Sequence, residues 1–146
     1  MRYLASLIFA LVLSVAFVAC GGEEAVCAER VADPGGVWCM TDTNIETTCE
    51  GGLNPPRDYF MRILQEGSDL SAATNYGWLK GRICGDQIRM SGESSRTSGD
   101  YTTTVTGNME LTISADGNSV EGSVTWAGTT PDQSCRGKDL MSGYRC

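Results

Sequence analysis

The chain of 146 residues contains no histidine. The Ser-His-Asp and Cys-His arrangements that activate a nucleophile therefore cannot form. The sequence also lacks Cys-x-x-Cys, Gly-x-Ser-x-Gly and phosphate-loop motifs, which argues against dithiol, zinc, hydrolase and nucleotide sites. The many acidic residues leave a carboxylate pair of the glycosidase kind open. We predict that the protein is not an enzyme and holds no metal ion and no cofactor.

Positive charge and aliphatic side chains are also scarce. The chain has 11 Lys and Arg against 18 Asp and Glu, a net charge of −7. Nucleic-acid binding needs a basic surface that displaces counterions, so nucleic acid is not an expected partner. Leu, Ile, Val and Phe number 18 in residues 20–146, about 14%, below the ~20% typical of disordered chains of high net charge. A fold of this composition needs support beyond its apolar core.

No apolar run is long enough for a membrane-spanning helix, which needs ~20 residues. An uncharged, mainly apolar run covers residues 4–18 and follows Arg2. A basic residue before a short apolar run is typical of an export signal. We therefore assign residues 1–19 to a signal peptide, and the remainder is the length of one domain.

The end of this signal is Phe17-Val18-Ala19-Cys20-Gly21. A small residue followed by cysteine at this place resembles the lipobox of bacterial lipoproteins, although Phe17 stands where the family usually has leucine. The resemblance implies cleavage after Ala19, a diacylglycerol on the Cys20 thiol and an acyl chain such as palmitate on its amino group. It also implies a location in the bacterial cell envelope, and Gly21 in place of aspartate favours the outer membrane. The alternative is an ordinary secretory signal.

The number of cysteines fits this assignment. An exported protein with an odd number of cysteines has one left over, and lipidation of Cys20 explains it. The other six predict up to three disulfides in an oxidising compartment, each worth ~2–5 kcal/mol to a small domain. Sequence does not decide the pairing, but proximity alone suggests Cys39–Cys49 and Cys135–Cys146, which leaves Cys27–Cys84.

Residues 20–36 are expected to form a lipid-anchored tether, and residues 37–146 the folded domain. The tether begins with glycines and acids and ends in Asp-Pro-Gly-Gly, a turn sequence. Because Cys27 lies within it, we expect the tether to be linked to the domain.

The remaining sequence predicts short strands joined by glycine-rich turns. Residues 101–113 and 119–127 alternate with period two around an Asp-Gly turn, which predicts a hairpin with a possible bulge near residues 107–108. The sequence from residue 63 to 70 repeats the pattern of 113–120, which favours a strand over a helix for residues 58–67. Residues 37–40 and 79–90 predict a further strand and hairpin. Residues 91–100 are expected to be a polar loop and residues 128–143 mostly loop.

These elements predict an all-β fold, a small antiparallel up-and-down barrel stabilised by disulfides, with a β-sandwich as the alternative. The Gly36-Val37-Trp38 sequence at the first strand looks like the Gly-x-Trp opening of lipocalins and avidins. That resemblance implies a small up-and-down barrel and identifies no ligand-binding residue.

Aromatic side chains are the main candidates for a binding site, because they either line a cavity or fill the core. The five candidates are Trp38, Trp78, Trp126, Tyr76 and Tyr101. We expect an envelope lipoprotein whose β-domain is an interaction or structural module. The alternatives are a lipocalin-like carrier of a small hydrophobic ligand and an inhibitor of an envelope-attacking enzyme. The expected partners are a membrane, through the lipid, and an unidentified protein or small molecule.

Overall fold

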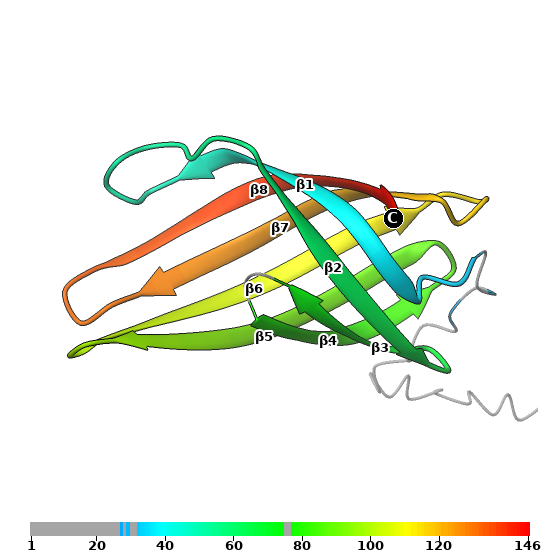
Figure 1. Ribbon diagram of the computed structural model, residues 1–146, viewed down its shortest axis with the longest axis horizontal. Coiled ribbons are helices and arrows are strands. Elements are labelled where there is room, and N and C mark those ends of the chain that lie inside the picture. The colour runs from blue at the N-terminus through cyan, green and yellow to red at the C-terminus, as the bar shows by residue number, and fades with distance from the viewer. Residues whose placement is uncertain (1–26, 28, 30–31, 75–76) are drawn as a thin grey trace, which may run out of the picture.

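A computed structural model describes residues 27, 29, 32–74 and 77–146. These residues form a closed barrel of eight antiparallel strands in sequence order, in which β1 pairs with both β2 and β8 (Figure 1). The strands are β1 (Gly36–Thr47), β2 (Arg57–Glu66), β3 (Asp69–Thr74), β4 (Gly77–Cys84), β5 (Gln87–Ser98), β6 (Tyr101–Ile113), β7 (Ser119–Thr129) and β8 (Ser134–Arg145). The up-and-down barrel is confirmed over the sandwich. No described segment is a helix long and apolar enough to cross a membrane.

Both hairpins at the repeated sequence are present. β6 pairs with β7, and the pair nearest their turn is Ile113 with Val120. β2 pairs with β3 in the same way, beginning with Glu66 and Asp69. Residues 58–67 are therefore strand and turn, as the repeat predicts. β6 keeps an unbroken register with both neighbours, so a bulge near residues 107–108 is wrong; the register shift lies in β1, between Asn44 and Glu46.

Two predicted loops are strands. β5 continues through residues 91–98 and pairs with β6 as far as Ser98 and Tyr101. This arm carries no apolar residue because its inner face borders the open end of the barrel. β8 occupies most of residues 128–143, where the inward positions include Gly137 and Gly143. A Cβ at Gly137 would overlap the Trp126 ring and one at Gly143 the Met40 sulfur, so these glycines replace the apolar side chains that mark a strand.

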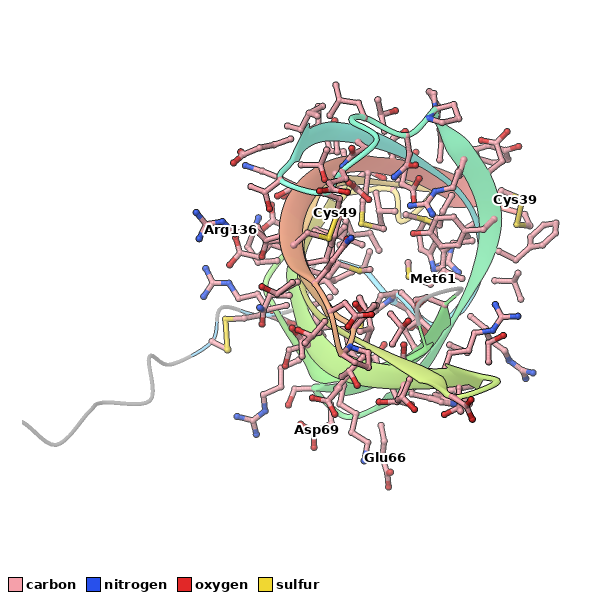
Figure 2. All side chains as sticks on the ribbon, turned by 90° about the vertical axis from the view of Figure 1, so that its left-hand side faces the viewer. Cys39, Cys49, Met61, Glu66, Asp69 and Arg136 are labelled. Atoms are coloured by element: carbon pink, nitrogen blue, oxygen red, sulfur yellow. A yellow bond between two sulfur atoms is a disulfide. The ribbon has the colours of Figure 1, made fainter. Side chains whose placement is uncertain are left out.

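The barrel interior has a packed half and a polar half. Figure 2 looks into the polar end and shows Met61 inside the ring of strands and Arg136 outside it. The packed half is filled mainly by methionine and branched aliphatic side chains. Its members under 2% exposed are Trp38, Met40, Met61, Ile63, Ala72, Ile88, Met109, Leu111 and Ile113.

Trp38 closes the packed end. It is fully buried, and its indole Nε1 donates a hydrogen bond to the Pro34 carbonyl at 2.8 Å. The Arg145 guanidinium lies 4.8 Å from the centre of the Trp38 ring. Arg145 also donates to the carbonyls of Gly35 and Gly117, each at 2.7 Å. The end of β8 thereby holds the chain before β1 and the β6–β7 turn against the same tryptophan.

Three disulfides join Cys27 to Cys84, Cys39 to Cys146 and Cys49 to Cys135. The prediction that Cys27 links the N-terminal segment to the domain is confirmed. The Cys39–Cys49 and Cys135–Cys146 pairs are wrong. Strand β8 separates Cys135 from Cys146 by about 35 Å at ~3.3 Å per residue, whereas a disulfide needs Cα atoms within ~7 Å. Strand β1 likewise places Cys39 and Cys49 far apart.

Candidate binding site at the barrel mouth

The open end of the barrel, here called the mouth, lies opposite the chain's C-terminus and is bordered by the β1–β2, β5–β6 and β7–β8 connections (Figure 1). The inner face of β1 changes character toward this end. Trp38 and Met40 are followed, at the same period of two, by Asp42 and Asn44. The inner face of β1 is therefore apolar near the closed end of the barrel and polar near the mouth.

Two carboxylates are buried at the base of the mouth and share one guanidinium. Asp42 is 1% exposed and Asp139 is fully buried. Arg57 Nε donates to Asp42 Oδ1 at 3.2 Å, and its Nη2 lies 3.7 Å from Asp139 Oδ2. A charge out of water needs such a partner, because desolvation costs several kcal/mol per ion. Arg57 therefore holds the inner faces of β1 and β8 together.

Neutral donors complete the surroundings of Asp139. Asn44 Nδ2 donates to Asp139 Oδ1 at 2.6 Å, and Trp126 Nε1 donates to the same oxygen at 3.0 Å. Asn44 also donates to the Glu46 carbonyl at 3.1 Å, across the register shift of β1. Charge-assisted bonds of this kind are stronger than neutral ones, so the cluster fixes the Trp126 ring in place.

Tyr59 also belongs to this polar cluster and is 7% exposed. Burial raises the pKa of its phenol far above the usual value, the Asp42 carboxylate adds to the increase and Arg57 opposes it. The Tyr59 phenol consequently remains protonated in the folded protein well into the alkaline range.

The Tyr59→Phe variant is expected to flatten the alkaline decline in stability. Above pH ~10 the unfolded chain releases the phenolic proton that the folded protein retains, so the free energy of unfolding falls by up to ~1.4 kcal/mol per pH unit from this group. Urea unfolding at pH 7, 10 and 11 measures how steeply the free energy of unfolding falls with pH. Tyr144→Phe, which removes an exposed outer phenol, is the control. An unchanged slope in Tyr59→Phe would contradict this assignment.

Trp126 contacts both the polar cluster and the open space inside the barrel. Its ring fits over Gly137, and it also lines a small apolar cavity of about 20 Å³ with Val105 and Gly107. Val105 in turn borders a larger open cup of about 500 Å³ at the mouth. The other residues of this cup are Thr74, Gly77, Ser94, Arg96, Ser98 and Thr103.

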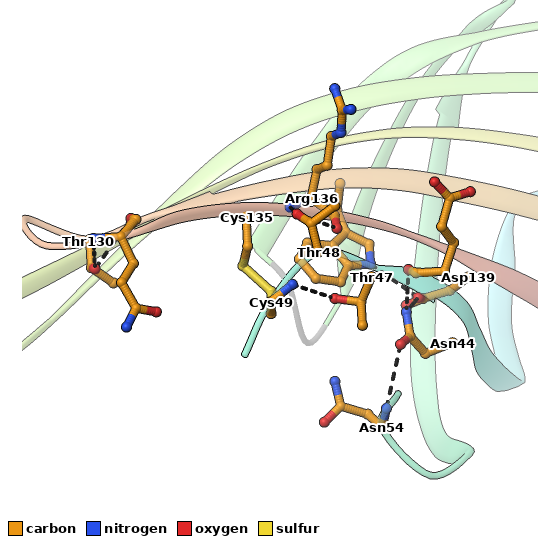
Figure 3. The surroundings of a disulfide bond; sticks show 12 residues. Asn44, Thr47, Thr48, Cys49, Asn54, Thr130, Cys135, Arg136 and Asp139 are labelled. Atoms are coloured by element: carbon orange, nitrogen blue, oxygen red, sulfur yellow. Dashed lines mark hydrogen bonds between the residues drawn. A yellow bond between two sulfur atoms is a disulfide. The ribbon is translucent and has the colours of Figure 1, made fainter. Parts of the chain in front are cut away.

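The β1–β2 connection is fixed to the neighbouring strand β8 by the Cys49–Cys135 disulfide (Figure 3). Thr48 donates its backbone N–H to the Arg136 carbonyl at 2.8 Å, and the Arg136 N–H donates to the Thr48 hydroxyl at 3.0 Å. The Asn54 N–H donates to Asn44 Oδ1 at 3.4 Å. The rim is therefore attached to both β8 and the polar cluster.

The aromatic candidates do not share one site. Trp126 lies at the mouth, Trp38 at the closed end, and Trp78 is 62% exposed on the outside of the barrel. Tyr76 and the side chain of Tyr101 lie outside the described residues.

Sequence reasoning missed the polar cluster itself. Its members are Asp42, Asn44, Arg57, Tyr59 and Asp139. One signal was available: residues 38–44 alternate with period two, so the residues at 42 and 44 share the face of Trp38 and Met40.

The arrangement offers fixed hydrogen-bonding groups on β1, β2, β7 and β8, and an open cup on the inner faces of β3–β6. Among the described residues, no group of three or more Cys, Asp and Glu is placed to hold a metal ion. Comparisons with protein family models, with curated proteins and with solved structures find no match to this chain.

Proposed function

We propose that this chain is a lipid-anchored protein of the bacterial envelope whose barrel is an interaction module that binds its partner at the mouth. The observation that carries the proposal is the contrast between the two halves of the interior. The closed half is filled by side chains, whereas the mouth holds an open cup of about 500 Å³ on the inner faces of β3–β6. The fixed polar cluster lies inside the barrel on β1, β2 and β8. The volume of the cup lies within the ~300–1,000 Å³ of ordinary binding sites.

The same contrast favours a module over a carrier of an enclosed hydrophobic ligand. The apolar cavity below the cup measures about 20 Å³. A space of that size holds roughly one water molecule and is far smaller than a hydrophobic ligand. A ligand of the barrel is therefore expected to sit in the cup, where Arg96 and hydroxyl side chains surround it.

The cysteines support the lipid anchor. Six of the seven form three disulfides, and Cys20 is the one that remains. Three disulfides in a small domain are typical of oxidising compartments outside the cytoplasm. A lone cysteine directly after an export signal is the residue that the lipobox resemblance assigns to lipid.

Arg96→Glu is expected to weaken retention of the bound molecule at least tenfold, because it reverses the charge of an arginine that lines the cup. Native mass spectrometry of the lipoprotein purified from its own host measures the bound fraction, and the added mass separates a small molecule from a protein.

Arg89→Glu is the matched control. Arg89 lies on the same strand, β5, but faces outward, where it forms an exposed ion pair with Glu110 at 3.5 Å. Equal retention by the wild type and both variants would place the binding surface away from the mouth.

A further inference from the structure

Four of the eight large apolar side chains that are exposed in the described part of the chain lie on one side of the barrel. Phe60 is 70% exposed, Trp78 62%, Leu64 47% and Val37 45%. They lie on the outer faces of β1, β2 and β4. Contiguous apolar surface of this kind marks an interaction site more often than isolated residues do.

Strand pairing shows that these side chains are neighbours. Val37 pairs with Arg62, Arg62 with Ala73, and Ala73 with Trp78, which gives one row across four strands. A second row runs from Leu64 through Ser71 to Lys80. Paired residues of an antiparallel sheet project from the same face. We call the two rows, together with Phe60, the flank.

The charges of the flank differ from those of the chain. Its charged members, Arg62 and Lys80, are both basic and both exposed, whereas the chain has a net charge of −7. The next row on the same outer face carries Glu66, Asp69 and Arg82, and Arg82 binds Asp69 at 3.0 Å. Asp58 precedes Phe60 on the outer face of β2 and accepts a hydrogen bond from Thr41 at 2.7 Å. A surface with tryptophan, apolar side chains and basic groups is suited to phospholipid headgroups and the region just beneath them.

The N-terminal segment reaches the protein at the end of β4, four residues beyond Lys80 of the flank. Cys84 ends β4, the strand that carries Trp78 and Lys80, and Cys27 is bonded to it. Seven residues of chain lead from Cys20 to Cys27, which span at most about 25 Å when fully extended. A lipid on Cys20 therefore holds the end of β4 close to the membrane surface.

We propose that the flank lies on the phospholipid headgroups of the membrane that holds the lipid, so that the barrel rests on its side. This orientation rests on the proposed lipid anchor. It leaves the mouth open to the aqueous compartment, beside the membrane. The disulfide between Cys27 and Cys84 places the attachment of the tether on β4, the strand that carries Trp78 and Lys80 of the flank.

Tryptophan fluorescence tests the orientation. The full lipoprotein is reconstituted into vesicles of phosphatidylethanolamine and phosphatidylglycerol, with and without lipids brominated in the upper acyl chain. Trp38 is fully buried and Trp126 is half-buried inside the barrel, so Trp78 is the tryptophan that bromine can reach. We expect brominated lipid to remove roughly a third of the emission, and Trp78→Phe to abolish that loss.

Arg62→Glu with Lys80→Glu gives an independent test, because it keeps all three tryptophans. We expect it to reduce the quenching at least twofold, while Arg89→Glu with Arg136→Glu on other outer faces leaves it unchanged. Vesicle-bound wild type without quenching, or quenching that survives in Trp78→Phe, would overturn the orientation while leaving the anchor intact. Protein that fails to float with the vesicles would overturn the lipid anchor and this orientation with it.

Discussion

Trp38→Ala is expected to lower the free energy of unfolding by about 3–5 kcal/mol, the range for removing a large aromatic side chain from a core. Trp38 is fully buried, and its ring fills the closed end of the barrel beneath Arg145. Its removal leaves a cavity, and it takes from the Pro34 carbonyl its hydrogen-bond donor. Urea unfolding, followed by far-UV circular dichroism with the disulfides intact, measures the change.

Trp78→Ala is the matched control, because it removes the same side chain from an exposed position on the outer face of β4. Exposed substitutions of this kind usually change stability by less than about 0.5 kcal/mol. If the two variants lost similar stability, Trp38 would not be the residue that closes the barrel.

Arg57→Met is expected to lower the free energy of unfolding by about 3 kcal/mol at neutral pH. The substitution keeps much of the side chain's volume but leaves Asp42 and Asp139 buried without their shared guanidinium. Breaking a buried pair by removing one partner costs ~3–5 kcal/mol, and the half-exposed position of Arg57 places the expected value at the lower end.

A second substitution separates charge from packing. Asp42→Asn removes one of the two carboxylates. The double variant with Arg57→Met is therefore expected to have a free energy of unfolding at least about 1 kcal/mol higher than Arg57→Met alone. Chemical denaturation of the wild type, the two single variants and the double variant gives the coupling energy. Additive losses in the double variant would show that Arg57 stabilises the barrel by packing alone.

The sequence predicts the barrel where each strand buries one face. β6 and β7 alternate because the inner residues, from Met109 to Val124, enter the packed half. The pattern fails toward the mouth, where the inner face meets water or a neighbouring ring. Ser94 and Arg96 border the cup, and Gly137 makes room for Trp126, so none of them is apolar. Polar residues at these inner positions therefore predict loops from the sequence, although the structure forms strands there.

The polar cluster was harder to predict than the fold. Alternation places Asp42 on the inner face of β1, but it does not reveal that Arg57 and Asp139 meet it from the two neighbouring strands. Those contacts depend on the register of β1 with β2 and β8, which is set across the whole barrel. The disulfides depend on the same register, since Cys39 on β1 meets Cys146 just after β8, at a sequence separation of 107.

Both the proposed anchor and the proposed orientation on the membrane depend on lipid at Cys20. The intact mass of the protein purified from its host's membranes, read before and after thiol alkylation, tests this directly. We predict a chain that begins at Cys20, carries a diacylglycerol and an acyl chain, and gains no mass on alkylation because the other six cysteines are in disulfides. A chain that keeps residues 1–19, or one with an alkylated Cys20, would contradict it.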